Sequence, residues 1–424
     1  MTLLLNLTLL LIFISFLSFL IKLDLKIVFL FGLLVFQAIT IIPSLIYIEE
    51  GILISEQGRE SYFVGATLAY VIYFMITFII IFLTFNTLKK YKPTILVFKI
   101  EKKPVDSKII YYLAVLALAI LFFNASQSKL PLLDPSITRF SYWENSKYPF
   151  LNKILGNTAI FIPFILGILF KNNKVKSILI LILYFAYNFL IGQKFSPIVS
   201  GLFSFLLPII LISEKKINFK MFFKKKFIVS FLVIFGIAYA VIYKRYEQRS
   251  PYAVIKIYDP NEAMFYRVFG LQGHLMWGSV ETYIYNDEEH SYKPSELLQG
   301  MHHLMYRFAA NQKGLEESLE KGFSFTNGYP SILFKIFPLW LALFVHIFLL
   351  ITMLAFTGWL LYEFIKQKAY VMAVVTYQLF NWTIYAFTMG YLYKLKYTIL
   401  FLVFYSIFVV LNNRVKIMKK IKTV

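Results

Sequence analysis

The sequence predicts an all-α, polytopic membrane protein with about 11 transmembrane helices and one large external helical loop. The composition is 59% hydrophobic and 19% aromatic with a mean hydropathy of +0.70, whereas soluble domains are roughly 45–50% apolar. The apolar residues form repeated runs of roughly 17–25 residues, the length that crosses ~30 Å of hydrocarbon. One long polar segment, 244–330, interrupts these runs and is predicted to lie outside the bilayer.

The apolar runs divide the chain into three parts. Residues 1–243 are expected to hold about 8 spans, 244–330 the external loop with amphipathic helices, and 331–424 about 3 spans. The approximate spans are Thr2–Ile21, Leu25–Tyr47, Tyr62–Phe85, Ile109–Phe123, Leu151–Phe170, Ser177–Ile191, Ser196–Ile212, Phe227–Tyr243, Ile332–Leu360, Ala369–Met389 and Tyr397–Leu411.

The basic residues predict which loops lie inside the cell. More than half of the 43 Lys and Arg residues fall in five segments with few acidic residues, which are 89–108, 171–176, 215–226, 366–368 and 414–422. Cytoplasmic loops carry such an excess of basic residues. These segments alternate correctly along the predicted spans only if the N-terminus is external and the C-terminus is cytoplasmic.

Composition also excludes several classes of site. The net charge of +21 is explained by the cytoplasmic loops, so we expect no nucleic-acid partner. The absence of cysteine excludes disulfides and thiolate metal sites. Neither a nucleotide-binding motif nor a metal-ligand spacing is present, so we expect no metal and no cofactor.

The first half of the segment 244–330 contains three polar side chains at helical spacing. Asp259 followed by Pro260 is typical of a helix start. Arg267, His274 and Glu281 then recur every seven residues, so an unbroken helix would place them on one face as a candidate catalytic group. Glycines between them weaken the prediction of an unbroken helix. The alternative is an ordinary solvated polar face.

A second amphipathic stretch begins at Pro294. Its apolar stripe is Leu297, Leu298, Met301, Leu304, Met305 and Phe308. His303 and Arg307 are four residues apart and share a helix face, where they are candidates to contact a diphosphate. The alternative is an interfacial helix that only shields the site.

Three further cations are candidate diphosphate ligands. Arg245 and Arg249 follow a span on the external side, and Arg offers a planar fork of donors that matches phosphate oxygens. Lys194 lies in a short hairpin, 192–197, where an ammonium is costly unless it pairs with an anion or reaches the interface. Head-group anchoring is the alternative for the two arginines, and extension of the side chain to the interface is the alternative for Lys194.

This arrangement resembles the bacterial Wzy-type polymerases of O-antigen or capsule repeat units, which are multi-span transferases using polyprenyl-diphosphate donors. The resemblance rests on the number of spans, the basic hairpin 192–197, a middle external loop at 124–150, and the large loop with its entrance 244–249 and its exit 323–330. It covers most of the chain in architecture and little in motif.

The resemblance implies an inner-membrane glycosyltransferase with a periplasmic active site. Its substrates would be undecaprenyl-diphosphate-linked oligosaccharides, joined by inverting transfer with release of undecaprenyl diphosphate. Membrane lipids and a chain-length regulator would be further partners. Arg267, Lys194, Arg245 and Arg249 would stabilise the leaving diphosphate, and His274 or Glu281 would act as the base. An O-antigen ligase and a lipid-linked oligosaccharide flippase are the alternatives.

Overall fold

The computed structural model describes residues 2–51, 61–91, 107–134, 137, 139–151, 161–193, 195–213, 236, 239–240, 243, 259–266, 270–299, 301–308 and 327–407. Every regular element within these ranges is a helix, which confirms the predicted all-α class for this part of the chain.

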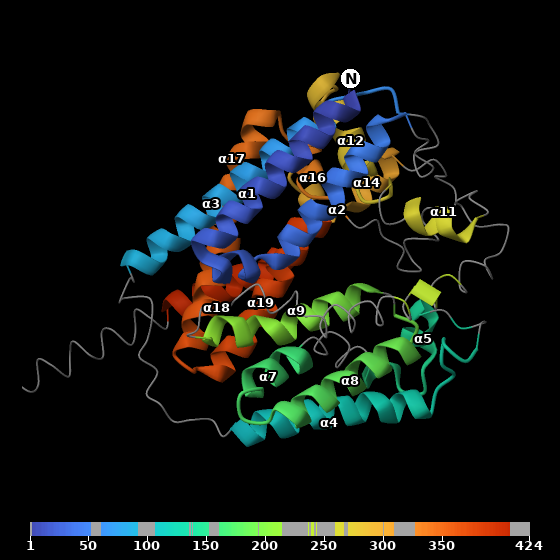
Figure 1. Ribbon diagram of the computed structural model, residues 1–424, viewed down its shortest axis with the longest axis vertical. Helices are drawn as coiled ribbons and strands as arrows, with labels where there is room; N and C mark the ends of the chain where they lie inside the picture. Colours follow the sequence, from blue (N-terminus) through green and yellow to red (C-terminus); the bar gives the residue numbers. More distant parts are fainter. Residues whose placement is uncertain are drawn as a thin grey trace, which may run out of the picture.

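The helices fall into an N-terminal set, a set from the predicted loop, and a C-terminal set (Figure 1). The first comprises α1 (Thr2–Leu30), α2 (Gly32–Glu49), α3 (Ala66–Tyr91), α4 (Ser107–Ser126), α5 (Arg139–Asn145), α7 (Phe161–Leu169), α8 (Lys174–Leu190) and α9 (Phe195–Ile212). The second comprises α11 (Pro260–Phe265), α12 (His274–Val280), the π-helix η3 (Glu281–Tyr285), α13 (Glu296–Gln299), α14 (Met301–Phe308) and α16 (Ser331–Ile336). The third comprises α17 (Leu339–Leu349), the π-helix η4 (Leu350–Ala355), α18 (Phe356–Lys366), α19 (Tyr370–Met389) and the 3-10 turn η5 (Leu392–Lys394).

Five helices within the described ranges are long and apolar enough to cross a membrane. They are Thr2–Leu30, Gly32–Glu49, Ala66–Tyr91, Ile109–Ser126 and Leu339–Lys366. Many of their exposed side chains are large and apolar, such as Leu4 on α1, Leu116 on α4 and Phe344 on α17. Apolar surface of this extent is unfavourable in water and favourable in hydrocarbon, so it supports a helical membrane protein.

Other predicted spans correspond to shorter or more polar helices. The ranges predicted at 151–170, 177–191, 196–212 and 369–389 overlap α7, α8, α9 and α19, respectively. Residues 395–407 are helical and form the described part of the last predicted span, while 227–243 lies almost entirely outside the described residues. The number of 11 spans therefore stays a prediction.

The apolar helix predicted at Ile332–Leu360 begins later in the structure, at Leu339. Helix α16 ends at Ile336, Phe337 is extended (φ −126°, ψ 148°), and the long apolar helix begins after Pro338. Proline disfavours helical backbone in the residue before it, which explains the break. The span therefore begins at Leu339, and α16 packs against α12 and α14 from the polar segment.

The helices form two groups that are joined by α18 and α19 (Figure 1). Helices α1, α2, α3 and α17 lie together, with α12, α14 and α16 at one end of this group. Helices α4, α7, α8 and α9 form the other group. Helix α18 contacts both α3 and α9, and α19 contacts both α2 and α7, so the two groups share one packed interior.

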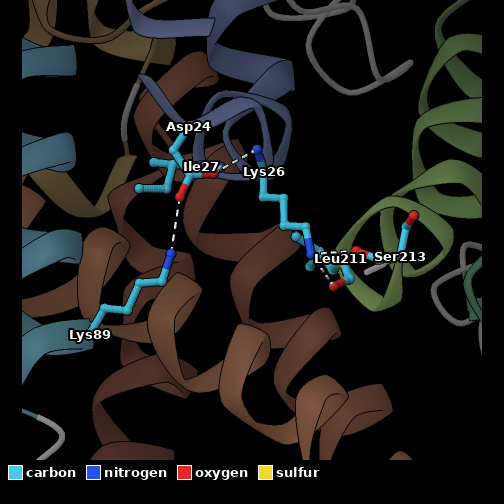
Figure 2. A network of polar contacts seen from close by, with 6 residues as sticks. All are labelled: Asp24, Lys26, Ile27, Lys89, Leu211 and Ser213. Carbon is cyan, nitrogen blue, oxygen red and sulfur yellow. Dashed lines mark hydrogen bonds and ion pairs between the residues drawn. The ribbon is translucent and has the colours of Figure 1, made fainter. Parts of the chain in front are cut away.

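A polar network ties three helices together at the end of the bundle remote from α12 (Figure 2). The α1 helix breaks at Asp24 (φ −154°, ψ 94°), whose carboxylate accepts the backbone N–H of Lys26 at 2.9 Å and pairs with Lys89 of α3 at 3.0 Å. The Lys26 ammonium donates to the carbonyl oxygens of Leu211 and Ser213, at 3.1 and 2.6 Å. These carbonyls end α9, where a cation is favourable because a helix C-terminus is partially negative.

We expect Lys26→Ala to destabilise the protein by about 1–2 kcal/mol, because two carbonyls at the end of α9 lose a charged donor. The thermal unfolding midpoint of the detergent-solubilised protein measures the effect. Lys22→Ala is the matched control, since Lys22 is exposed in the same turn. Equal midpoints for the two variants would contradict a stabilising role for Lys26.

Candidate functional site

The described part of the predicted external loop forms a helical cap on the bundle. We use "the cap" for residues 259–266, 270–299, 301–308 and 327–336, which include α11 to α16. Helix α12 is buried along its whole length and packs against α2, α3, α14 and α16 (Figure 1). The cap is therefore an integral part of the packed structure.

A helix start and a break in the cap follow from local sequence. Asp259 accepts the backbone N–H groups of Asn261 and Glu262, at 3.2 and 3.3 Å, so the predicted capping of the helix that begins at Pro260 is confirmed. Residues 271–273 then form a turn before α12 begins at His274. This turn separates α12 from residue 270, and Arg267 lies outside the described residues, so the shared face of Arg267 and His274 stays a prediction.

Ser44 of α2 fixes this turn to the bundle. Its hydroxyl donates to the carbonyl oxygen of Gly270 at 2.8 Å and accepts the N–H of Gly273 at 2.8 Å. Gly273 permits the approach, because a Cβ there would lie 3.0 Å from both the Ser44 Oγ and the Leu45 side chain. One buried hydroxyl thus satisfies two backbone groups of the cap.

His274, the predicted base, lies in the interior of the cap. Its side chain is 1% exposed, and its Nδ1–H donates to the carbonyl oxygen of Leu271 at 2.7 Å. A general base must come within hydrogen-bond reach of the proton it removes. In this conformation His274 helps to close the turn that precedes α12, and its role as a base stays a prediction that requires access from the cap surface.

Glu281, the other predicted base, is less enclosed. It is half-buried and begins the π-helix η3, which continues α12 directly. Single π-helical turns occur frequently at functional sites. Glu281 and His274 therefore lie on one helical stretch as predicted, with Glu281 nearer to solvent.

A charged and aromatic surface lies beside η3. Arg307 of α14 pairs with Glu288, and both side chains are exposed. Tyr283 is buried beside them, and burial raises the pKa of its hydroxyl to about 12; Glu288 and Glu296 add to the rise and Arg307 opposes it. The Tyr283 hydroxyl therefore stays protonated and can donate at neutral pH.

A second ion pair joins α13 to α16 within the cap. Glu296 accepts from the Lys335 ammonium at 3.0 Å and from the Ser291 hydroxyl at 3.0 Å, and both charged side chains are largely buried. The backbone N–H groups of Ser291 and Tyr292 donate to the carbonyl oxygens of Lys335 and Ile336, at 3.0 and 3.1 Å. Segment 288–296 is thereby held against α16.

Residues 327–330, the described part of the loop exit, are buried, and three polar contacts hold them. Gln37 of α2 donates to the Asn327 side chain at 3.2 Å, and Asn327 donates to the carbonyl oxygen of Gln272 at 3.0 Å. The Tyr329 hydroxyl hydrogen-bonds His346 Nδ1 at 2.8 Å. Cap, loop exit and apolar helices thus form one hydrogen-bonded unit.

His346 connects the loop exit to α3. Its Nε2 lies 3.0 Å from the Thr77 hydroxyl while its Nδ1 faces Tyr329, so both ring nitrogens have partners. The ring is 1% exposed and packs 4.9 Å from the Tyr73 ring. These contacts assign His346 a positioning role for residues 327–330.

Of the predicted diphosphate ligands, the structure describes the side chain of Arg307 alone. Arg307 lies on the cap surface in α14, which packs against α12. His303 lies in α14, but its side chain is outside what the structure describes. Lys194, Arg245 and Arg249 lie outside the described residues.

Sequence reasoning missed several residues that hold the cap in place. Ser44 and Gln37 stand in an apolar run, where a polar side chain is a sign of a partner. Asn327 and Tyr329 fall within the loop exit, whose segment carried part of the resemblance. Nothing in the sequence marks the pairing of Glu288 with Arg307, because their spacing of 19 residues belongs to no local pattern.

The apolar stripe predicted for the second amphipathic stretch is largely confirmed. Met301, Leu304 and Phe308 are buried and Leu297 is partly buried. Leu298 is 62% exposed, so its assignment to the stripe is wrong. The side chain of Met305 is not described.

We expect Ser44→Ala to loosen the cap, because the Gly270 carbonyl and the Gly273 N–H each lose a buried partner. Leaving such groups unsatisfied costs about 1–3 kcal/mol. Hydrogen exchange of the amides in residues 270–280 should accelerate. Ser18→Ala is the control, since that exposed hydroxyl bonds only within α1, and equal exchange in both variants would argue against the role of Ser44.

Residues 294–405 match the model of a family of unknown function, DUF6418. The matched region takes in α13 and α14 of the cap, α16, and the apolar helices α17 to α19. No curated protein and no solved structure matches the chain. The similarity therefore covers the second half of the cap together with the helices beneath it.

Proposed function

We propose that this chain is an inner-membrane glycosyltransferase that joins undecaprenyl-diphosphate-linked oligosaccharide repeat units into a surface polysaccharide. The anomeric carbon of the donor glycan forms a bond to an acceptor hydroxyl oxygen. The bond between that carbon and the diphosphate breaks with inversion, and undecaprenyl diphosphate leaves. The hydroxyl proton passes to a base on the protein.

The observation that carries the proposal is a folded cap fixed to a bundle of apolar helices. A lipid-linked sugar needs an apolar surface for its chain and a polar surface beside it for the reacting groups. Ser44 and Gln37 join the two surfaces through hydrogen bonds to the cap. Such fixed geometry suits a transfer reaction, because catalysis depends on holding both substrates in position.

The arrangement of lysines supports the proposed orientation. Lys26, Lys89 and Lys366 lie at the same end of the bundle, since Lys89 pairs with Asp24 beside Lys26, and Lys89 and Lys366 both lie over the Tyr362 ring. The sequence assigns 89–108 and 366–368 to the cytoplasm. The cap lies at the other end, in keeping with a periplasmic site, a periplasmic N-terminus and a cytoplasmic C-terminus.

The roles of individual residues follow from charge and access. Lys194, Arg245, Arg249 and Arg267 are the proposed cations for the leaving diphosphate, and preorganised cations stabilise developing negative charge most where water is excluded. Glu281 is the better placed of the two proposed bases, because it is half-buried while His274 is enclosed.

A deletion strain tests the proposal through the ladder of its surface glycan on a gel. Loss of a polymerase leaves single repeat units attached to their acceptor, so the ladder should collapse to one step. A ligase, the alternative transferase, would leave no repeat units attached. An unchanged ladder in the deletion strain would exclude both transferases.

The orientation gives a separate prediction. Alkaline phosphatase fused after Asn311 should be active, because that position is proposed to be periplasmic, and a fusion after Lys216 should be silent. Matched expression of the two fusions is checked on an immunoblot. The reverse pattern of activity would overturn the orientation without bearing on the reaction.

A further inference from the structure

The surface beside η3 contains a segment whose backbone is held in an uncommon conformation. Asp287 and Tyr292 both have positive φ, at 49° and 47°, although neither is glycine. Such residues are uncommon, and strained backbone gathers at ligand sites, where surrounding contacts maintain it. The Glu288 N–H donates to the carbonyl oxygen of Thr282 at 3.1 Å, and the Tyr292 N–H to that of Ile336 at 3.1 Å. The segment is therefore fixed at both ends.

The fixed backbone presents an exposed aromatic ring. Tyr292 is 60% exposed, and one edge of its ring packs against His290 at 5.9 Å between centroids. The His290 Nδ1–H donates to the carbonyl oxygen of Phe334 at 2.9 Å, which orients the imidazole. A tyrosine supported in this way offers a rigid contact area that loses little conformational entropy on binding.

A series of ring contacts leads from Tyr292 through His290 and the buried Tyr283 toward the charged groups of the cap surface. The Tyr283 ring lies 6.2 Å from His290 and 6.4 Å from Phe308, the residue after Arg307. Arg307 pairs with Glu288 on the same side. We call the exposed side chains of Glu288, Tyr292 and Arg307, together with the partly buried His290, the Tyr292 surface.

The charge around the Tyr292 surface disfavours an anionic ligand, although the exposed Lys293 follows Tyr292. Asp287, Glu288 and Glu289 are consecutive and exposed, and the Arg307 guanidinium is already paired with Glu288. Three carboxylates repel a diphosphate and the anionic head groups of a membrane. A neutral ligand rich in hydroxyl groups fits better, because carboxylates accept from hydroxyls while guanidinium and imidazole N–H groups donate to them.

We propose that the Tyr292 surface binds a pyranose ring of an oligosaccharide. One face of the sugar lies on the Tyr292 ring, where its C–H groups lose contact with water. The hydroxyls at the edge of the sugar bond with Glu288 and Arg307. The inference rests on the proposed function in taking the glycan of the lipid-linked substrate as the ligand, and it adds a site that holds sugar away from the diphosphate.

The test is titration calorimetry of the purified full chain with the native cell's own surface polysaccharide, released from lipid by mild acid. The wild type should bind, Tyr292→Ala should weaken binding about tenfold, and Tyr292→Phe should retain it because the ring remains. Tyr62→Ala is the matched control, since Tyr62 is 80% exposed outside the surface and should bind as the wild type. Equal unfolding midpoints for all four proteins establish that the fold is intact.

Two results would overturn the inference. One is an absence of binding by the wild type, and the other is equal binding by the wild type and Tyr292→Ala, which would assign the ring to anchoring at the membrane interface. Failure of the proposed function is read separately, from an unchanged glycan ladder in the deletion strain. A collapsed ladder with unaltered binding by Tyr292→Ala would retain the transferase and discard this sugar site.

Discussion

The need to satisfy backbone hydrogen-bonding groups without water governs the junction between cap and bundle. A buried N–H or carbonyl group that lacks a partner costs free energy comparable to a lost hydrogen bond. Ser44 satisfies the turn before α12, and Glu49, at the end of the same helix, satisfies the start of α3. The Glu49 carboxylate accepts the N–H groups of Gly65 and Thr67, at 3.0 and 2.9 Å, and that of the Asn6 side chain at 2.7 Å. Polar side chains of the apolar helices therefore provide the partners that water provides in a soluble domain.

The two ends of the bundle use charge differently. At the Asp24 end, Lys26 and Lys89 bind groups that belong to other helices, so their charge joins α1, α3 and α9 (Figure 2). At the cap end, Glu296 with Lys335 and Glu288 with Arg307 join residues of the cap to one another. The first arrangement holds helices together within the bundle, and the second stiffens a surface that faces water. This difference fits a protein that binds a polar molecule at the cap end.

Local sequence patterns predicted the helices well. The burial and pairing of the site residues depend on contacts between residues distant in sequence, which local patterns do not reveal. Hydropathy located the five longest apolar helices, and the Asp259-Pro260 pair located the start of α11, because both features depend on neighbouring residues. The burial of His274 depends on α2, α3 and α16 packing around α12, which no spacing within residues 259–285 reveals. The turn at 271–273 precedes α12 in the region where the intervening glycines had weakened the prediction of an unbroken helix. Of the candidate site, the sequence therefore predicted residue types and the region, while the pairing of Glu288 with Arg307 required the fold.

The pairing of Glu288 with Arg307 implies that different cations of the proposed substrate site bind the sugar and the diphosphate. The Arg307 guanidinium is paired with Glu288, and further acidic residues lie nearby. It is therefore poorly suited to hold a diphosphate and well suited to bond sugar hydroxyls. In the proposed reaction the leaving diphosphate would then depend on Lys194, Arg245, Arg249 and Arg267. In the sequence these residues have no acidic neighbour within two positions except Glu247, between Arg245 and Arg249. A lipid-linked glycan carries its diphosphate next to the membrane and its sugars farther out. Phosphate ligands close to the apolar helices and a sugar surface on the cap would follow the same order along the substrate.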